Sequence, residues 1–379
     1  MNIVYFFTYG YSLKTWKDSG QLDRELEHFK YWKKLNPDLN LTIITYGNEE
    51  DLKFINDNFI TVIPVYKYEK FSNSKIINFI KSFFIVNSLK EITKGKFIDV
   101  VIQNQLLGSW IAYKFKKSIN TSLIVRTGYD MYEFSIKENK SSLKKFFYRL
   151  LTKISLKNSE LYTVTSNCDK NFLIKQFGEN YESKIKVRKN WVSLMNEKEI
   201  KPFDKRFNNR IVCVGRIEEQ KNYETIINGI KGTDFKIDIF GEGTLKNHIL
   251  QLSREKNVDV EFKGIVDNNE LKEMLKNYKY YLTASKFEGN PKSVLEAMSA
   301  GCLIIASDIK NHREFLNSEN SILFEDKNSL NEIIKNLNIK YQYHNKLTKN
   351  ALKTIRKNYE LEKIATSELN DLINLSSKN

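Results

Sequence analysis

The chain has 379 residues, of which 41% are hydrophobic, so it is too long for one ordinary core and indicates about two domains. Its 61 Lys and Arg residues outnumber 46 Asp and Glu residues, and the net charge of +15 favours polyanionic partners. Three cysteines lie far apart, which excludes a disulfide framework and a clustered cysteine zinc site and predicts a cytoplasmic protein. No run of about 18 apolar residues occurs, so no membrane-spanning helix is predicted.

Short apolar segments alternate with longer amphipathic segments along the whole chain, as is typical of parallel α/β sheets. In the first half the pattern predicts strands at 2–8, 41–46, 59–65, 99–103, 122–126, 160–165 and 184–188. The same pattern predicts helices at 22–34, 74–92, 106–117, 142–157 and 169–177.

The alternation stops between Val192 and Asn209, where Pro202 lies in a stretch without hydrophobic periodicity. We interpret 196–209 as a linker between domains. The alternation then resumes, with strands predicted at 210–214, 235–240, 258–263, 280–283, 303–306 and 321–324.

These segments predict an N-terminal α/β domain over 1–195 and a second α/β domain over 210–355. A C-terminal helix is expected over 356–379, within a tail that looks helical throughout from 345 to about 375. Parallel α/β domains bind ligands at the carboxyl ends of their strands, so the candidate sites lie in the loops that follow the strands.

The first motif with chemical content follows the first strand of the second domain, where Gly215 lets the chain turn. Arg216 and Lys221 lie five residues apart there, just before a helix predicted to begin near Asn222. Two cations at a strand end are suited to hold a diphosphate, Arg as a fork and Lys as a point charge. The alternative is a solvated loop, which often carries such residues.

The second motif runs from Glu288 through Asn290 and Pro291 to Glu296. Asn290 suits an N-cap and Pro291 the first helical turn, so a helix is predicted from Pro291 to Ala300. The free N–H groups at its start form an anion site, and both carboxylates can accept hydrogen bonds from ligand hydroxyls. The alternative is a capped helix with two surface glutamates.

Together these motifs resemble the retaining glycosyltransferases of family 4 (glycosyl transferases group 1), which have the GT-B fold. Further segments in the family's order are Phe240-Gly241-Glu242-Gly243, Phe262-Lys263-Gly264-Ile265-Val266, Ser307-Asp308-Ile309 and Arg313-Glu314. The resemblance implies two Rossmann-like domains with parallel sheets facing a central cleft, and a C-terminal helix that crosses back to the N-terminal domain. It also implies that the domain over 1–195 binds the acceptor and the domain over 210–355 binds the nucleotide sugar.

The resemblance also implies roles for residues of the second domain. Arg216 and Lys221 would hold the diphosphate of a nucleotide-sugar donor, while Glu288 would bind the sugar hydroxyls and Glu296 the ribose. Other residues would surround the sugar, the phosphates and the nucleobase. They are Gly243, Ile265, Val266, Gly289, Asn290, Pro291, Lys292, Ser293 and Val294.

The first domain departs from the family's pattern. Its glycine-rich loop, where amides meet the donor phosphate, is represented by Gly20, with Gly10 as the second candidate. The family often has a histidine after a middle strand that contacts the donor sugar, and this chain has none there. Asp130, assigned as catalytic, or Arg126 is the candidate replacement, and a turn held by an Asx bond is the alternative.

The predicted function is metal-independent, retaining transfer of a hexosyl or N-acetylhexosaminyl group from a nucleotide sugar such as a UDP-sugar. The acceptor would be a glycan or a lipid-linked molecule in surface polysaccharide, capsule, lipopolysaccharide or glycolipid biosynthesis. No cofactor and no metal are expected, because the chain has no Asp-x-Asp pair and the cations would do the metal's work. The alternatives are a GT-B-fold binding protein without turnover and a nucleic-acid binder driven by charge, for which no recognition motif is present.

The helix predicted at 142–157 carries an apolar stripe, which we expect to pack on the first sheet. The alternative is an interfacial helix on anionic lipid, which would suit a lipid-linked acceptor and a peripheral place at the inner face of the cell membrane. The aromatic and basic segment 66–84 is a second candidate for such contact. The stripe consists of Leu143, Phe146, Phe147, Leu150, Leu151 and Ile154.

Overall fold

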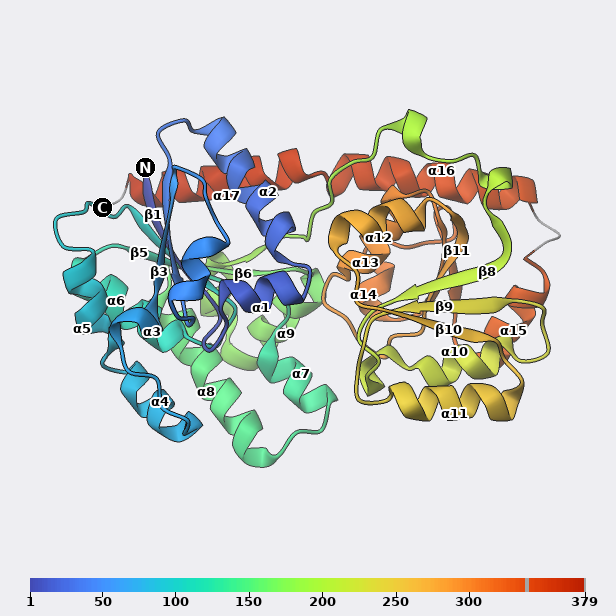
Figure 1. The fold of residues 1–379 in the computed structure, drawn as a ribbon, viewed down its shortest axis with the longest axis horizontal. Helices are drawn as coiled ribbons and strands as arrows, with labels where there is room; N and C mark the ends of the chain where they lie inside the picture. The colour runs from blue at the N-terminus through green and yellow to red at the C-terminus, as the bar shows by residue number, and fades with distance from the viewer. Residues whose placement is uncertain (338–340, 378–379) are drawn as a thin grey trace. The chain divides into compact units, whose positions relative to one another are not determined.

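A computed structural model describes residues 1–337 and 341–377 (Figure 1). Its contacts divide the chain into two compact units, one formed by Met1–Arg188 with the chain from Ala365 onward, the other by Lys189–Ile364. Each unit is built on one parallel sheet, which confirms the predicted α/β fold of two Rossmann-like domains. Among the described residues, no helix combines the length and the apolar character needed to cross a membrane.

The sheet of the first unit has seven parallel strands in the order β3-β2-β1-β4-β5-β6-β7. Each corresponds to one of the strands predicted in the first half, with bounds that differ by a few residues. The central strands are almost fully buried, because helices cover both faces of a parallel sheet. The strands are β1 Asn2–Phe6, β2 Asn40–Thr45, β3 Ile60–Pro64, β4 Val100–Asn104, β5 Ser122–Arg126, β6 Leu161–Val164 and β7 Ile185–Val187.

The helices of the first unit differ from the prediction in two ways. The short helices α1, α3 and α7 are absent from the prediction, because four to seven residues hold too little periodic pattern. The single helix predicted at 74–92 is wrong: the chain turns at Phe83 and Phe84, where the ring of Phe83 stacks on Trp110 with 6.2 Å between centroids. The helices are α1 Leu13–Asp18, α2 Leu22–Leu35, α3 Val65–Tyr68, α4 Lys75–Ser82, α5 Ile85–Ile92, α6 Ser109–Ile119, α7 Met131–Lys137, α8 Ser142–Asn158 and α9 Asn167–Phe177.

The sheet of the second unit has six parallel strands in the order β10-β9-β8-β11-β12-β13, and all six were expected from the sequence pattern. Its side chains alternate between two cores, as the two-residue period of a strand requires. On β8, Ile211 and Cys213 join one buried cluster and Val212 joins the other. The strands are β8 Phe207–Val214, β9 Lys236–Phe240, β10 Val260–Gly264, β11 Tyr278–Thr283, β12 Leu303–Ser307 and β13 Ile322–Phe324.

The helical tail is broken, which corrects the prediction of one continuous helix. The break lies at Tyr359 and Glu360, because Val192 pairs with the chain there like a strand. The amide of Val192 donates to the carbonyl of Tyr359 at 2.8 Å, and the amide of Leu361 donates back to Val192 at 3.2 Å. The helices from the second unit to the end of the chain are α10 Tyr223–Ile230, α11 Lys246–Lys256, α12 Asn268–Leu275, α13 Lys292–Ser299, α14 Lys310–Arg313, α15 Lys327–Lys335, α16 Tyr341–Asn358 and α17 Leu361–Ser376.

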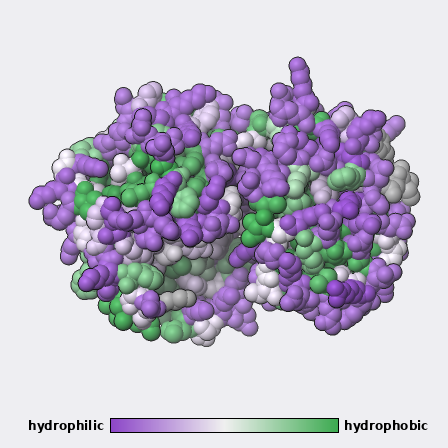
Figure 2. Space-filling view, in the orientation of Figure 1, coloured by the Kyte–Doolittle hydropathy of each residue, from purple (hydrophilic) through white to green (hydrophobic). Residues whose placement is uncertain are grey.

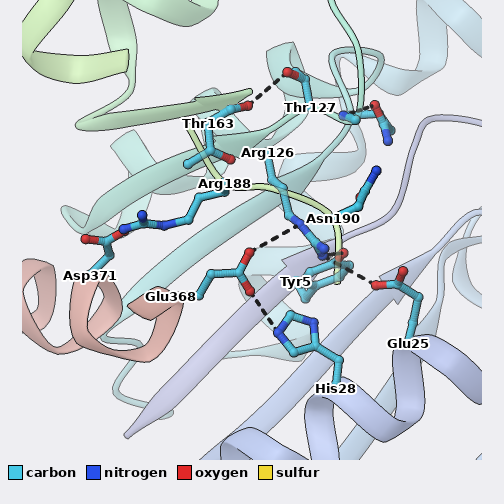
Figure 3. Close-up of polar contacts among 12 residues, drawn as sticks. Tyr5, Glu25, His28, Arg126, Thr127, Thr163, Arg188, Asn190, Glu368 and Asp371 are labelled. Carbon is cyan, nitrogen blue, oxygen red and sulfur yellow. Dashed lines mark hydrogen bonds and ion pairs between the residues drawn. The ribbon is translucent and has the colours of Figure 1, made fainter. Parts of the chain in front are cut away.

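The end of α17 belongs to the first unit, which confirms the expected return of the C-terminal helix (Figure 3). Glu368 lies 2.8 Å from Nε2 of the buried His28 and 3.8 Å from the guanidinium of Arg126, the last residue of β5. One turn further along, Asp371 forms ion pairs with Arg188 and Lys186. Two carboxylates on one face of α17 are therefore held by cations at the carboxyl end of the first sheet.

The position of α8 contradicts the expectation that its apolar stripe packs on the first sheet. The helix is anchored by Leu151, Ser155 and Leu156, which are buried. Most of the predicted stripe is exposed instead, and Leu143 at its start is 78% exposed. The hydrophobic pattern identified the helix correctly but assigned the wrong face to the core.

Candidate functional site

The order of the second sheet reverses between β8 and β11, which are neighbours although they are far apart in sequence. In open α/β sheets, ligands bind outside the carboxyl ends of the strands at such a reversal. Both sequence motifs follow these two strands, and the amide of Lys286 donates to the carbonyl of Gln220 at 2.8 Å. The structure therefore brings the two motifs together where a ligand site is expected.

Lys221 and Glu288 form an ion pair at this place, with 2.5 Å between Nζ and Oε1. Their side chains are 15% and 8% exposed, so the pair is largely withdrawn from solvent. Gln220 donates to the carbonyl of Phe287 at 2.9 Å and approaches the second Glu288 oxygen at 3.4 Å. Burial alone would raise the pKa of Glu288, but the Lys221 ammonium outweighs it and holds that pKa below its ordinary value. Glu288 is therefore a carboxylate at neutral pH.

Arg216 lies on the exposed side of the same loop, and its guanidinium approaches Oε1 of Gln220 at 3.4 Å. Gly215 has a φ of +149°, and a Cβ there would lie 3.0 Å from Cε of Lys221. A larger residue would therefore displace the lysine from Glu288. Tyr223 also donates to the carbonyl of Gly215 at 3.1 Å and holds the turn.

Gly241 and Gly243, which follow β9, pack directly against the backbone of the loop that carries Arg216. A Cβ on Gly241 would overlap the carbonyl oxygen of Gly215, and a Cβ on Gly243 would overlap that of Ile217. Glycine is required at both positions because two backbones approach each other directly. The resemblance implied a donor contact for Gly243, and the structure gives both glycines a packing role that supports the loop of Arg216.

The second motif starts α13 one residue later than predicted. The N-cap is Pro291, and the prediction that Asn290 caps the helix is wrong. The Asn290 side chain instead accepts a hydrogen bond from the amide of Asn190 at 2.9 Å, and its carbonyl accepts another from the Asn190 side chain. A bond to a residue one hundred positions away has no local sequence pattern, so the motif could not reveal it.

The remaining predicted donor residues surround this helix start. Glu296 is buried and accepts a hydrogen bond from Asn268 at 2.7 Å, and Ser293 accepts one from Tyr281 at 2.9 Å. Burial raises the pKa of Tyr281, and both Glu288 and Glu296 lie near enough to raise it further. Gly289 and Val294 are buried, Lys292 and Val266 are half-buried, and Ile265 is exposed after β10.

His312 is a further residue of this region that the motifs did not single out. It is fully buried, and its Nδ1 lies 2.7 Å from the carbonyl oxygen of Ser307, so Nδ1 carries a proton. Burial lowers the pKa of His312, which interacts electrostatically with Glu288 and Lys221. Its Nε2 has no hydrogen-bond partner among the residues that the structure describes. A neutral histidine in this state can accept a hydrogen bond at Nε2. The sequence signal that could have pointed to His312 was its place in the 307–314 segment, which follows the family's motif order.

The candidates in the first unit lie in a different setting. Gly20 has a φ of +68° in the turn between α1 and α2. Asp130 is the N-cap of α7 and accepts a hydrogen bond from the amide of Glu133 at 2.7 Å. Burial raises the pKa of Asp130 to about 7. Arg126 contacts Glu25 at 3.4 Å and belongs to the charge cluster that holds α17.

Comparison with known proteins gives a family for the second unit and relatives for most of the chain. Residues 196–354 match the family "Glycosyl transferases group 1". The chain is 27% identical over 348 residues to the N-acetylgalactosamine-N,N'-diacetylbacillosaminyl-diphospho-undecaprenol 4-alpha-N-acetylgalactosaminyltransferase of Campylobacter jejuni, covering 88% of this chain and 93% of that protein. It is 25% identical over 251 residues to the capsular polysaccharide biosynthesis glycosyltransferase CapH of Staphylococcus aureus, covering 62% and 66% of the two chains.

Solved structures share the fold over the whole chain. Sucrose-phosphate synthase from Thermosynechococcus elongatus superimposes with a TM-score of 0.81 at 14% identity, covering 100% of both chains. The Anabaena protein HepE in complex with UDP and glucose superimposes with a TM-score of 0.75 at 13% identity, covering 99% of this chain and 100% of that one. The family match, the relatives and the GT-B fold agree, and the chain is a glycosyltransferase whose second unit carries the glycosyl transferases group 1 domain.

Proposed function

We propose that the chain transfers a hexosyl or N-acetylhexosaminyl group from a nucleoside-diphosphate sugar, with UDP as the nucleotide, to a glycan or lipid-linked acceptor. The observation that carries the donor site is the buried pair of Lys221 and Glu288 at the reversal of the second sheet. The names of the relatives support the acceptor class, because one acts on a diphospho-undecaprenol-linked sugar and another serves capsular polysaccharide biosynthesis. HepE, which shares the fold, was solved with UDP and glucose.

Arg216 and Lys221 would bind the diphosphate and neutralise the charge that develops on it as the bond to the sugar breaks. Fixed cations contribute strongly in a site from which water is excluded, since they need no reorganisation during the reaction. The amides of Lys292, Ser293 and Val294 at the start of α13 would add donors for the phosphates. Lys221 contacts Glu288 already, so phosphate and sugar recognition would be coupled through one ion pair.

Glu288 would accept hydrogen bonds from sugar hydroxyls, and Glu296 would do so from the ribose. Both carboxylates are buried among polar partners, which keeps their oxygens fixed. In the proposed reaction, the acceptor hydroxyl oxygen bonds to the anomeric carbon on the face from which the diphosphate leaves. The bond between that carbon and the diphosphate oxygen breaks, and the hydroxyl proton passes to the departing diphosphate. The anomeric configuration is then retained, and no metal ion is needed.

The test is nucleotide release from a panel of UDP-, GDP- and ADP-sugars, measured for wild type and for Arg216→Ala. We expect slow release of UDP from one or a few donors by wild type only, unchanged by EDTA. Proton NMR of the product formed with an identified acceptor would show the same anomeric configuration as the donor. Stabilisation by UDP without release would instead favour a binding protein that does not turn over, and loss of activity in EDTA would contradict metal independence.

A further inference from the structure

The outer face of α8 is apolar and unpartnered in the first unit. Its exposed side chains recur every three or four residues, which places them on one face of a helix. The opposite face of α8 packs on the unit through Leu151, Ser155 and Leu156, so the helix is firmly seated. The exposed members of the stripe are Leu143, Phe146, Leu150 and Ile154.

A second exposed apolar face lies on α4 and the turn that follows it. Ile76 is 72% exposed and Phe84 is 67% exposed, with Ile77 and Ile80 between them. On the inner side of the same helix, Asn78 and Ser82 are buried, and Ser82 accepts a hydrogen bond from Nε1 of Trp110 at 2.9 Å. These contacts hold the inner side of α4, and its isoleucines remain on the solvent side.

The two helices lie beside each other. The rings of Phe79 on α4 and Phe147 on α8 are in an edge-to-face arrangement with 6.4 Å between centroids. Phe79 also packs edge-to-face on Trp110, which ties both helices to α6. In the space-filling view, hydrophobic atoms gather along the lower left edge, where Figure 1 shows α4 and α8 (Figure 2). We call the exposed side chains of the two helices the α4/α8 surface.

Every charged residue in the two sequence segments that carry the α4/α8 surface is positive. Residues 70–90 contain four lysines, residues 139–159 contain six lysines and arginines, and neither segment contains an Asp or Glu. On α8, Arg149 and Lys153 are exposed and lie within three or four positions of the apolar stripe, so they border it on the helix surface. Long basic side chains can place their apolar stems on a hydrophobic layer and their charges at its edge.

We propose that the α4/α8 surface binds the face of an anionic lipid bilayer, with its apolar side chains among the acyl chains and its cations at the lipid phosphates. An amphipathic helix with a basic border binds such a face through both apolar burial and charge. A second copy of this chain is disfavoured as the occupant, because a symmetric contact would set these cations against each other. Membrane binding is inferred independently of the proposed function. Only the purpose of this binding, to bring the enzyme to a lipid-linked acceptor, rests on that function.

The test is co-sedimentation of the full chain with vesicles, which requires no turnover and therefore fails or succeeds separately from the proposed activity. We expect binding to vesicles of phosphatidylglycerol and phosphatidylethanolamine, and weak binding to phosphatidylcholine vesicles. Added salt should weaken binding to the anionic vesicles. The variant with Ile77→Gln, Ile80→Gln, Leu143→Gln and Phe146→Gln should bind them about tenfold or more weakly, since it removes the buried apolar area.

The matched control replaces two apolar residues that are exposed elsewhere on the first unit, Leu52→Gln and Ile373→Gln, and should bind as wild type does. A second variant, with Lys145→Gln, Arg149→Gln and Lys153→Gln, keeps the apolar face and should lose binding by a factor on the order of a hundred. Far-ultraviolet circular dichroism and the unfolding temperature should match wild type, because the replaced side chains are exposed, except for that of Lys145, which is half-buried. Equal binding by wild type and both variants would overturn the proposal. So would equal binding to anionic and neutral vesicles, or a wild-type dimer that the apolar variant abolishes.

Discussion

Oε1 of Glu288 lies 2.5 Å from the ammonium of Lys221, and this pair joins the two motifs that follow β8 and β11. The lysine keeps the glutamate ionised in a buried setting, and the glutamate keeps the lysine in place before any ligand arrives. A donor that brings both a diphosphate and a hydroxylated sugar could engage both partners at once. If one partner is removed alone, the charge of the other stays buried without its counter-ion.

Lys221→Ala should lower the affinity for UDP by about tenfold to a hundredfold, since it removes one charge-assisted contact to the diphosphate. It should also lower the free energy of unfolding by about 3 kcal/mol, because the buried Glu288 carboxylate loses its partner. Isothermal calorimetry and urea unfolding measure the two effects. Lys286→Ala breaks an exposed ion pair with Glu219 and is the matched control, expected to change neither quantity. Unchanged UDP affinity in Lys221→Ala would remove this lysine from the donor site.

Glu288→Ala should reduce turnover by about a hundredfold or more, because the hydroxyl acceptor that aligns the sugar is lost. Binding of UDP alone should stay within a few-fold of wild type, since UDP lacks the transferred sugar whose hydroxyls Glu288 is proposed to contact. Single-turnover kinetics and calorimetry with UDP separate these effects. Glu288→Gln retains the shape of the side chain without its charge, so its turnover should lie between those of wild type and Glu288→Ala. Equal losses of turnover and UDP affinity in Glu288→Ala would contradict the assigned contact with the sugar.

Asp130→Asn should change how stability depends on pH. Burial raises the pKa of Asp130 from 3.8 to about 7, so the folded chain holds this proton more tightly than the unfolded chain does. The contribution of Asp130 to stability is therefore full below about pH 4 and falls as the pH rises toward about 7, by up to about 4 kcal/mol. Asn preserves the cap of α7 and removes this slope. Urea unfolding from pH 4 to 8 tests the prediction, with the exposed N-cap variant Asp267→Asn as a control that keeps the wild-type slope.

Glu368→Gln should loosen the C-terminal helix from the first unit. Burial raises the pKa of Glu368, but Arg126 and then His28 outweigh it and lower the pKa to about 2. Glu368 therefore stabilises the fold above its ordinary pKa of 4.5, and this contribution is lost as the pH falls toward about 2.

At neutral pH, Glu368→Gln should lower the free energy of unfolding by about 3 kcal/mol, and its difference from wild type should shrink below about pH 4.5. Hydrogen exchange of the α17 amides should increase in the same variant. Glu362→Gln changes an exposed carboxylate on the same helix and should have little effect. If both variants exchange like wild type, the charge cluster does not hold α17.

The residues of the proposed donor site could be found from the sequence because they lie in two short segments that follow strands. The strand pattern places both segments at the same edge of the second sheet. They carry Arg216, Lys221, Glu288 and Glu296. The motif order drew attention to the 307–314 segment, but no local pattern marks the buried nitrogen of His312 within it. The Asn190–Asn290 contact could not be predicted, since it joins distant segments. The candidates of the first unit, Gly20, Arg126 and Asp130, follow no comparable motif.

The sequence by itself determined the α/β class, the strands of both sheets and the two motifs of the proposed donor site, because apolar runs, helical periods and strand-end residues are local properties. Only the tertiary structure decided which side of α8 faces solvent, where Val192 interrupts the tail, and how α17 is held by Glu368 and Asp371. An amphipathic pattern fixes the angle between side chains on one helix but not the direction in which that helix docks. That direction depends on contacts with segments far away in sequence, and it turned the apolar stripe of α8 from an expected core face into an exposed surface.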